Sequence, residues 1–251
     1  MTRNIQSKDI TQLVERLCIE ANCHLTDDIY QCLGECCKKE KSPLGKDILN
    51  TLIENADIAR SGNDPICQDT GMTVVFITMV QDIHIEGGYI EDAINQGVRQ
   101  GYEKGYLRKS VVSDPLERVN TKDNTPAIIH YEIVPGDEFH NTVAPKGFGS
   151  ENMSQLKMLK PSQGLPGIKD FVINTISEAG ANPCPPIIVG IGIGGTMERC
   201  AYISKKALLR PVNEKNSNPK LAELESELLE AINKLGIGPA GLAGTTTALS
   251  V

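Results

Sequence analysis

The stretch Met72-Thr-Val-Val-Phe-Ile-Thr-Met-Val80 decides the fold class. It is an unbroken run of β-branched and apolar residues, a pattern typical of a buried β-strand. Residues 10–59, before it, carry apolar side chains at helical spacing, and residues 88–106, after it, predict a further helix. Helices on both sides of a buried strand predict an α/β class of the mixed α+β kind.

Apolar spacing and turn residues predict the remaining elements. Helices are expected over residues 10–18, 29–37 (after a cap at Thr26 or Asp27), 44–59, 164–180, 196–209 and 219–235. Strands are expected over residues 126–134, 138–144 and 186–193 and at the C-terminus; the first two form a hairpin around Pro135-Gly136. His130 and His140 would then pair across neighbouring strands. Since no repeat or linker interrupts the pattern, we expect a single domain over residues 1–251, with N-terminal helices and a central mixed sheet flanked by helices.

Composition excludes several classes of protein. The chain has 251 residues, 40% of them hydrophobic and 23% charged, with a net charge of −7, which is ordinary for a globular protein. No apolar run reaches the ~18–20 residues of a membrane helix, and no basic block indicates nucleic acid as a partner. Eight cysteines without an export signal favour the reducing cytoplasm, where thiols act as metal ligands, nucleophiles or core residues.

Two cysteines stand directly before apolar strands, where ligand-binding loops commonly lie. Cys67-Gln68-Asp69 offers a thiol, an amide and a carboxylate in consecutive residues; the alternative is a turn with one half-buried thiol. Cys184 lies between prolines on a stiff backbone that suits a metal ligand; the alternative is a buried cysteine at a strand entrance. Sequence spacing alone defines no metal site for these two thiols, because no CxxC pair is present.

Two glycine-rich segments could bind anions. In residues 144–152, Lys146 and the neighbouring glycines could form an anion-binding nest, or simply a flexible exit from a strand. Residues 190–195 match the G-x-G-x-x-G pattern of dinucleotide-binding proteins. Too little chain follows them for a complete dinucleotide-binding unit, so these glycines predict close packing of a strand on a helix or another anion-facing turn.

The order of these motifs resembles the catalytic alpha part of the iron–sulfur hydro-lyases, that is, the class I fumarases and L-tartrate dehydratases. The similarity extends from about residue 10 to Val251. The blocks that carry it are I-C-Q-D-T-G (66–71), N-T-P-A-I-I-H (124–130), A-P-K-G-F-G-S-E-N (144–152), C-P-P-I-I-V-G-I-G-I-G-G-T-M-E (184–198) and G-I-G-P-A-G-L-A-G-T-T-T-A-L (236–249).

The resemblance implies a [4Fe–4S] cluster held by three cysteines, with one iron acting as a Lewis acid on the substrate's hydroxyl group. Cys67 and Cys184 match two of these ligands. The third family cysteine lies downstream of the C-terminal block, and this sequence ends at Val251. We therefore expect a chain truncated at its C-terminus, without the third cluster cysteine and with the cluster absent.

The resemblance also implies roles in binding and proton transfer for residues near the cluster. Asp69 matches the acid beside the leaving oxygen, and Gln68 matches a contact to substrate or cluster. An arginine fork suits a carboxylate, which is the role implied for Arg108. The residues that match the cradle for a second carboxylate are Lys146, Gly147 and Gly149.

The implied function is reversible hydration of fumarate to L-malate, as in the tricarboxylic acid cycle, by an oxygen-sensitive cytoplasmic enzyme. Dehydration of L-tartrate to oxaloacetate is the alternative within the family, and a nucleotide-binding domain using Gly190–Gly195 is a distant one. The family's beta part supplies the catalytic base. We therefore expect a separate beta subunit as partner, no activity of this chain alone, and dimerisation through the alpha part.

Overall fold

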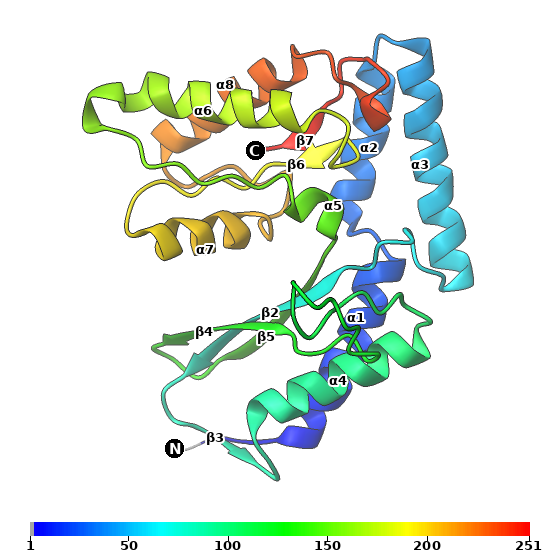
Figure 1. Ribbon diagram of the computed structural model, residues 1–251, viewed down its shortest axis with the longest axis vertical. Coiled ribbons are helices and arrows are strands. Elements are labelled where there is room, and N and C mark those ends of the chain that lie inside the picture. The colour runs from blue at the N-terminus through cyan, green and yellow to red at the C-terminus, as the bar shows by residue number, and fades with distance from the viewer. Residues whose placement is uncertain (1–2) are drawn as a thin grey trace. The chain divides into compact units, whose positions relative to one another are not determined.

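The computed structural model describes residues 3–251, which form two compact units (Figure 1). One unit comprises residues 3–25 and Asn55–Phe148, and the other comprises Thr26–Glu54 and Gly149–Val251. Each unit contains both helices and strands, which confirms the predicted mixed α/β class. The strands form three small sheets in place of one central sheet.

The first unit is built around a three-stranded sheet. Its middle strand is β2 (Met72–Val80), which pairs in parallel with β4 (Ile128–Val134) and antiparallel with β5 (Phe139–Lys146). A two-stranded parallel sheet joins β1 (Arg3–Gln6) to β3 (Ile83–Glu86), a pairing that the sequence did not predict. The apolar run that defines β2 thus takes the central place, with hydrogen-bonded neighbours on both edges.

The predicted hairpin between β4 and β5 is wrong. The two strands flank β2 on opposite edges and do not pair with each other, because the most apolar strand occupies the sheet centre. His130 and His140 therefore do not pair. His130 stacks on Phe76 of β2 with ring centroids 5.0 Å apart, whereas His140 bonds to Glu138 at 2.9 Å.

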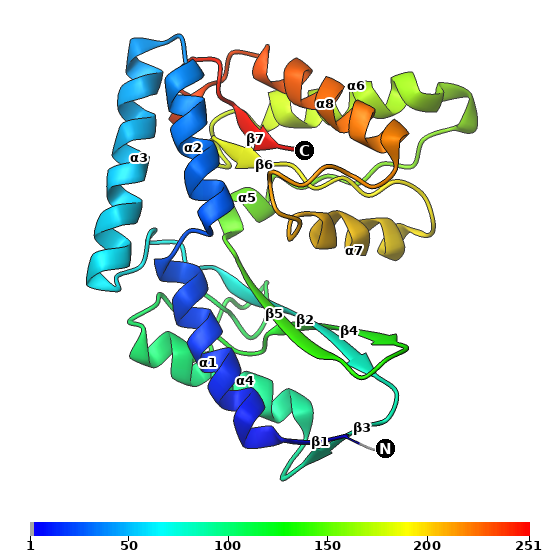
Figure 2. The same cartoon turned by 180° about the vertical axis from the view of Figure 1, so that it is seen from behind.

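Two helices, α1 (Ser7–Cys23) and α4 (Ile90–Lys104), lie side by side against one face of this sheet (Figures 1 and 2). Their close approach depends on Gly97, where a Cβ atom would lie 2.6 Å from the Thr11 carbonyl oxygen. The core between helices and sheet consists of Ile10, Val14, Cys18, Val75, Ile77, Ala93, Ile94, Val98, Tyr102, Leu107 and Ala127. This packing gives β2 and the loop before it a rigid support.

The second unit packs helices on a short parallel sheet. The sheet joins β6 (Ile187–Ile188) to β7 (Ala248–Ser250), and α6 (Gly164–Ala179) and α8 (Pro219–Asn233) share the core on it. The other helical elements are α2 (Asp27–Lys39), α5 (Phe148–Glu151), α7 (Met197–Ala207) and the 3-10 turns η1 (Pro161–Gln163) and η2 (Pro239–Gly241). A further helix, α3 (Pro43–Gly62), contributes residues to both units. Among residues 3–251, no helix is long and apolar enough to span a bilayer.

Candidate active site

The loop from Cys67 to Gly71 leads directly into β2 and carries three of the predicted site residues. The side chains of Cys67 and Gln68 are exposed, and that of Asp69 is half-buried. The backbone N–H of Asp69 donates to the Cys67 sulfur at 3.4 Å, and the thiol lies 3.5 Å from Gln68 Oε1. A soft sulfur donor and a carboxylate thus lie on the same turn, just before the N-terminal end of the buried strand β2.

Gly71 brings this loop against the end of β5. Its φ of +65° is in the left-handed region, and a Cβ atom there would collide with the backbone of Lys146 and Gly147. At Gly147, a Cβ atom would in turn lie 3.1 Å from Asp69 Oδ2. The structure therefore brings Asp69, Lys146 and Gly147 together, although they are far apart in sequence.

The loop that carries Arg108 is tied to the same turn. The hydroxyl of Thr70 donates to the Arg108 carbonyl oxygen at 2.8 Å, and the Tyr102 hydroxyl donates to the Thr70 carbonyl oxygen at 2.8 Å. The Asn124 side-chain amide donates to the Gly71 carbonyl oxygen at 3.0 Å. The Arg108 side chain itself is exposed and therefore accessible to a ligand.

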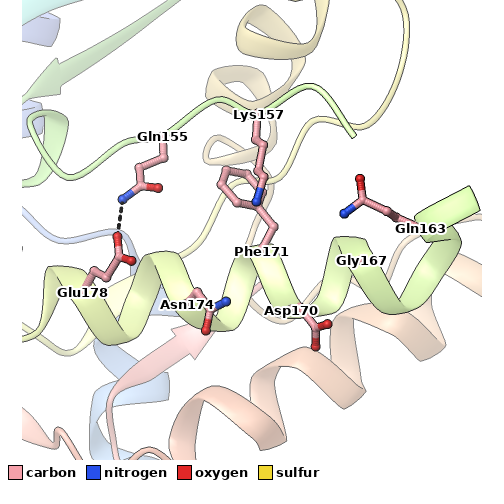
Figure 3. A pocket seen from close by; sticks show the side chains of 8 residues that line it. All are labelled: Gln155, Lys157, Gln163, Gly167, Asp170, Phe171, Asn174 and Glu178. Carbon is pink, nitrogen blue, oxygen red and sulfur yellow. Dashed lines mark hydrogen bonds between the residues drawn. The ribbon is translucent and has the colours of Figure 1, made fainter. Parts of the chain in front are cut away.

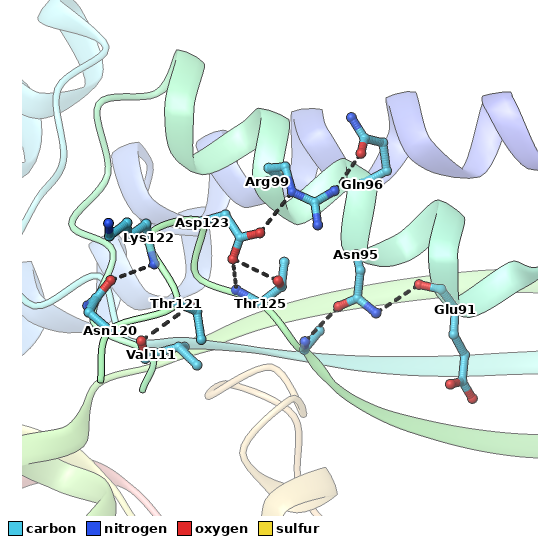
Figure 4. Close-up of polar contacts among 11 residues, drawn as sticks. Glu91, Asn95, Gln96, Arg99, Val111, Asn120, Thr121, Lys122, Asp123 and Thr125 are labelled. Carbon is cyan, nitrogen blue, oxygen red and sulfur yellow. Dashed lines mark hydrogen bonds and ion pairs between the residues drawn. The ribbon is translucent and has the colours of Figure 1, made fainter. Parts of the chain in front are cut away.

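Residues 108–124, predicted as a long loop, are ordered by many hydrogen bonds (Figure 4). Arg99 Nε donates to Asp123 Oδ2 at 2.9 Å, and Thr125 donates to the other Asp123 oxygen through its amide and hydroxyl. Burial acts to raise the pKa of Asp123, but the hydrogen bonds from Thr125 and Arg99 outweigh it and hold that pKa below its usual value. The Thr121 amide closes the loop on the Val111 carbonyl oxygen at 3.0 Å. A loop fixed in this way can present Arg108 at a defined place.

Cys184 and Gly149 belong to the second unit. Cys184 lies between Pro183 and Pro185 with a φ of +57°, its side chain is exposed, and its sulfur lies 4.0 Å from the Asn182 carbonyl oxygen. A Cβ atom at Gly149 would lie 3.5 Å from that same oxygen. Gly149 and the Cys184 turn are therefore neighbours within this unit.

The donor chemistry of Cys67 and Cys184 suits an iron–sulfur cluster. Both are free and exposed thiols on loops that are held by backbone geometry, and the Cys67 sulfur already accepts a backbone N–H. Within the described residues, no three His, Cys, Asp or Glu side chains gather as a metal-binding group. Each thiol is thus, by its chemistry and exposure, suitable as a ligand for iron.

Close packing explains two of the four glycines of residues 190–195. At Gly190 and Gly192, a Cβ atom would collide with the carbonyl oxygens of Ser204 and Cys200 in α7. Close contact between the strand segment and this helix therefore requires glycine at both positions. The predicted strand over 186–193 is shorter than expected, because only Ile187 and Ile188 pair in a sheet.

A polar hollow of about 360 Å³ lies along α6 and contains none of the predicted site residues (Figure 3). Its walls include Lys157, whose ammonium group lies 5.8 Å from the Phe171 ring centroid, and Gln155, which donates to Glu178 at 3.0 Å. Asp170 also lines the hollow, but the wall holds no cysteine and none of the residues predicted for the reaction.

Three buried polar residues hydrogen-bond separate segments of the chain to each other, and the sequence did not predict them. Asn124 and Thr70 connect the two loops of the first unit, and Glu40 binds the C-terminal segment of the second. Asn124 opens the block N-T-P-A-I-I-H, and asparagine before a Thr-Pro pair is a recognisable turn signal. Nothing local in the sequence marks the other two.

The first unit of this mixed α/β chain thus carries a thiol, a carboxylate and an arginine on adjoining loops. The model of the fumarate hydratase (Fumerase) family matches residues 11–251. The "Putative L(+)-tartrate dehydratase subunit alpha" of Methanocaldococcus jannaschii is 46% identical over 248 residues, which cover 96% of this chain and 87% of the relative. The L(+)-tartrate dehydratase subunit alpha of Escherichia coli K12 is 34% identical, covering 96% of this chain and 80% of the relative. The chain belongs to the fumarate hydratase (Fumerase) family and is a hydro-lyase.

Proposed function

We propose that this chain is the alpha subunit of an iron–sulfur hydro-lyase that converts L-tartrate to oxaloacetate. The observation that carries the choice of substrate is the 46% identity, over nearly the whole chain, to a relative named as a tartrate dehydratase alpha subunit. Hydration of fumarate to L-malate, which the sequence motifs favoured, is the second candidate, supported by the name of the family. Dehydration of L-tartrate breaks a C–O bond and the neighbouring C–H bond of a four-carbon diacid, and hydration of fumarate forms the same pair of bonds.

In this proposal Cys67 and Cys184 are two ligands of a [4Fe–4S] cluster. When bound, the cluster supplies a Lewis acid that makes hydroxide a better leaving group. Each thiol is exposed and lies on a turn that precedes a strand, so neither needs to leave a packed core to bind iron. The thiols then remain sensitive to oxidants, which gives an oxygen-sensitive enzyme.

The residues on the two tied loops hold the diacid and move its proton. Arg108 binds one carboxylate through its guanidinium fork, while Lys146 and the amides of Gly147 and Gly149 bind the other. Gln68 contacts the substrate or the cluster. Asp69 donates a proton to the departing hydroxyl group, which leaves as water; the proton on the neighbouring carbon goes to a base of the beta subunit.

The whole 251-residue chain acts, in this proposal, as one catalytic alpha-type domain with a beta subunit as its partner. The relatives are themselves named as alpha subunits. Dimerisation through this chain follows the resemblance to the family. The proposed location is the reducing cytoplasm, where the eight cysteines would stay free thiols.

The substrate assignment predicts a preference that steady-state kinetics can measure. The chain is produced without oxygen together with its beta subunit, and oxaloacetate formation from L-tartrate is compared with loss of fumarate. We expect kcat/KM to be at least about tenfold higher for L-tartrate, because a site built to bind a second hydroxyl group discriminates against a diacid that lacks it. The chain without its partner serves as the control and should turn over neither substrate.

The opposite preference would assign fumarate hydration to the enzyme. Saturable binding of NAD or ATP without turnover of either diacid would instead favour the nucleotide-binding alternative at Gly190–Gly195.

A further inference from the structure

Buried side chains join the Cys67–Gly71 turn to the loop that carries Arg108. Asn124 is 0% exposed and Thr70 is 3% exposed, so neither hydrogen bond competes with solvent. Asn124 Nδ2 donates to the Gly71 carbonyl oxygen at 3.0 Å, and its Oδ1 accepts from the amides of Ser110 and Val111 at 2.8 and 3.1 Å. Thr70 Oγ1 donates directly to the Arg108 carbonyl oxygen at 2.8 Å. The two loops are thus linked at the Arg108 carbonyl group and at the Ser110 and Val111 amides, two and three residues further along the chain.

Asparagine is chemically matched to this place. Its φ is +61°, a left-handed conformation that asparagine tolerates better than most residues. Its carboxamide donates to one loop and accepts from the other at the same time. A carboxylate in its place could accept the two amides but could not donate to the Gly71 carbonyl oxygen.

The link matters because the two loops present different functional groups. The Asp69 carboxylate lies on one loop, and the exposed Arg108 guanidinium extends from the other. Arg108 is proposed to bind one carboxylate of the diacid. The substrate hydroxyl group then lies next to Asp69 only if the backbones of the two loops keep a fixed separation. A displaced Arg108 loses its paired hydrogen bonds to the substrate carboxylate, and substrate binding weakens.

We propose that Asn124 and Thr70 are positioning residues that set where Arg108 stands relative to Asp69. This inference rests on the proposed function, in which Arg108 binds a substrate carboxylate. Neither residue contacts the substrate; both act through the backbone of the Arg108 loop. Their removal should therefore weaken substrate binding by way of Arg108 and leave iron binding unchanged.

The test measures KM and kcat for L-tartrate, and iron content, in the complex of this chain with its beta subunit. Asn124→Asp, which breaks only the bond to Gly71, and Thr70→Val should each raise KM about tenfold, whereas Thr70→Ser, which keeps the hydroxyl, restores it. Thr121→Val is the matched control, because Thr121 Oγ1 bonds the Val111 carbonyl oxygen at 3.3 Å within the Arg108 loop only. Its KM should stay within about twofold of the parent value.

A double-mutant cycle shows whether the effect passes through Arg108. In an Arg108→Ala background, Asn124→Asp and Thr70→Val should raise KM no further. A lower kcat at unchanged KM, or a full additional rise in KM without Arg108, would overturn the inference. An unchanged KM in Arg108→Ala alone would reject the carboxylate-binding role of Arg108 in the proposed function. That outcome differs from the one that rejects the positioning role, in which Arg108→Ala raises KM but the Asn124 and Thr70 variants do not. Should Asn124→Asp not fold, Thr70→Val carries the test.

Discussion

Asp69→Asn is expected to lower kcat for the diacid substrate by about 10²–10⁴-fold, the usual contribution of a positioned acid or base. Asn has the same shape as Asp but cannot release a proton to the departing hydroxyl group. The carboxylate lies half-buried against Gly147, two residues after Cys67, so the change removes proton transfer without removing a cluster ligand. The measurement is kcat for L-tartrate and for fumarate in the anaerobic complex with the beta subunit, together with iron content, which should stay at the parent level.

The matched control is Asp82→Asn, an exposed aspartate in the turn between β2 and β3. It lies in the same unit as Asp69 but outside the proposed site, and its kcat should equal that of the parent enzyme. If Asp69→Asn keeps the kcat of the Asp82→Asn control, Asp69 is no proton donor.

Glu40→Gln is expected to cost about 2–3 kcal/mol of unfolding free energy at neutral pH. Glu40 is 2% exposed, and its carboxylate accepts from the amides of Lys41, Ser42 and Thr245 at 2.8–2.9 Å and from the Thr245 hydroxyl at 3.0 Å. Burial acts to raise the pKa of Glu40, but hydrogen bonds from Ser42, Thr245 and Thr246 outweigh it and bring the pKa to about 2. The side-chain amide of Gln carries N–H donors, and these would face the backbone N–H groups of Lys41, Ser42 and Thr245, which are also donors.

The pH dependence has a definite sign. The folded-state pKa of Glu40 is depressed to about 2, while an unfolded glutamate titrates near about 4.3. The stabilisation is therefore present above about pH 5 and is lost as the pH falls towards 2. In urea unfolding at pH 7, the free energy of unfolding should be lower for Glu40→Gln than for the parent chain. This difference in free energy should shrink steadily between pH 5 and pH 3.

Glu35→Gln is the control for this effect. Glu35 lies on α2 and pairs with Lys39 at 3.7 Å, but both side chains are exposed, so its loss should cost less than about 0.5 kcal/mol. Equal losses for the two variants would show that Glu40 does not anchor the C-terminal segment.

Local patterns predicted most of the helices and the central strand. The spacing of apolar residues placed α2, α4, α6 and α8 close to their observed bounds, because a helix buries one face whatever it packs against. The pairing of β4 with β5 was wrong because strand partners are chosen by the whole sheet. The short β6 reflects Gly190 and Gly192, whose contact with α7 involves residues further along the chain.

In the candidate site, too, some residues could be predicted from the local sequence, and others could not because their partners are distant in the chain. Loops before strands identified Cys67, Asp69 and Cys184 as candidates, and the resemblance supplied their proposed roles. Asn124 and Glu40 were missed because the groups they bind lie 53 and 205 residues away along the chain. A buried polar side chain is recognised only when its partners are known.

Whether Cys67 and Cys184 hold an iron–sulfur cluster is measured by the iron and acid-labile sulfide in the complex with the beta subunit, purified without oxygen. With a third cysteine completing the ligand set, about four irons are expected for each copy of this chain, and most of that iron should be lost in Cys67→Ser and in Cys184→Ser. Cys200→Ser, whose sulfur contacts the Met197 carbonyl oxygen at 3.3 Å on α7, should keep the full amount. A full complement of iron in Cys67→Ser or Cys184→Ser would show that the substituted cysteine is not a cluster ligand.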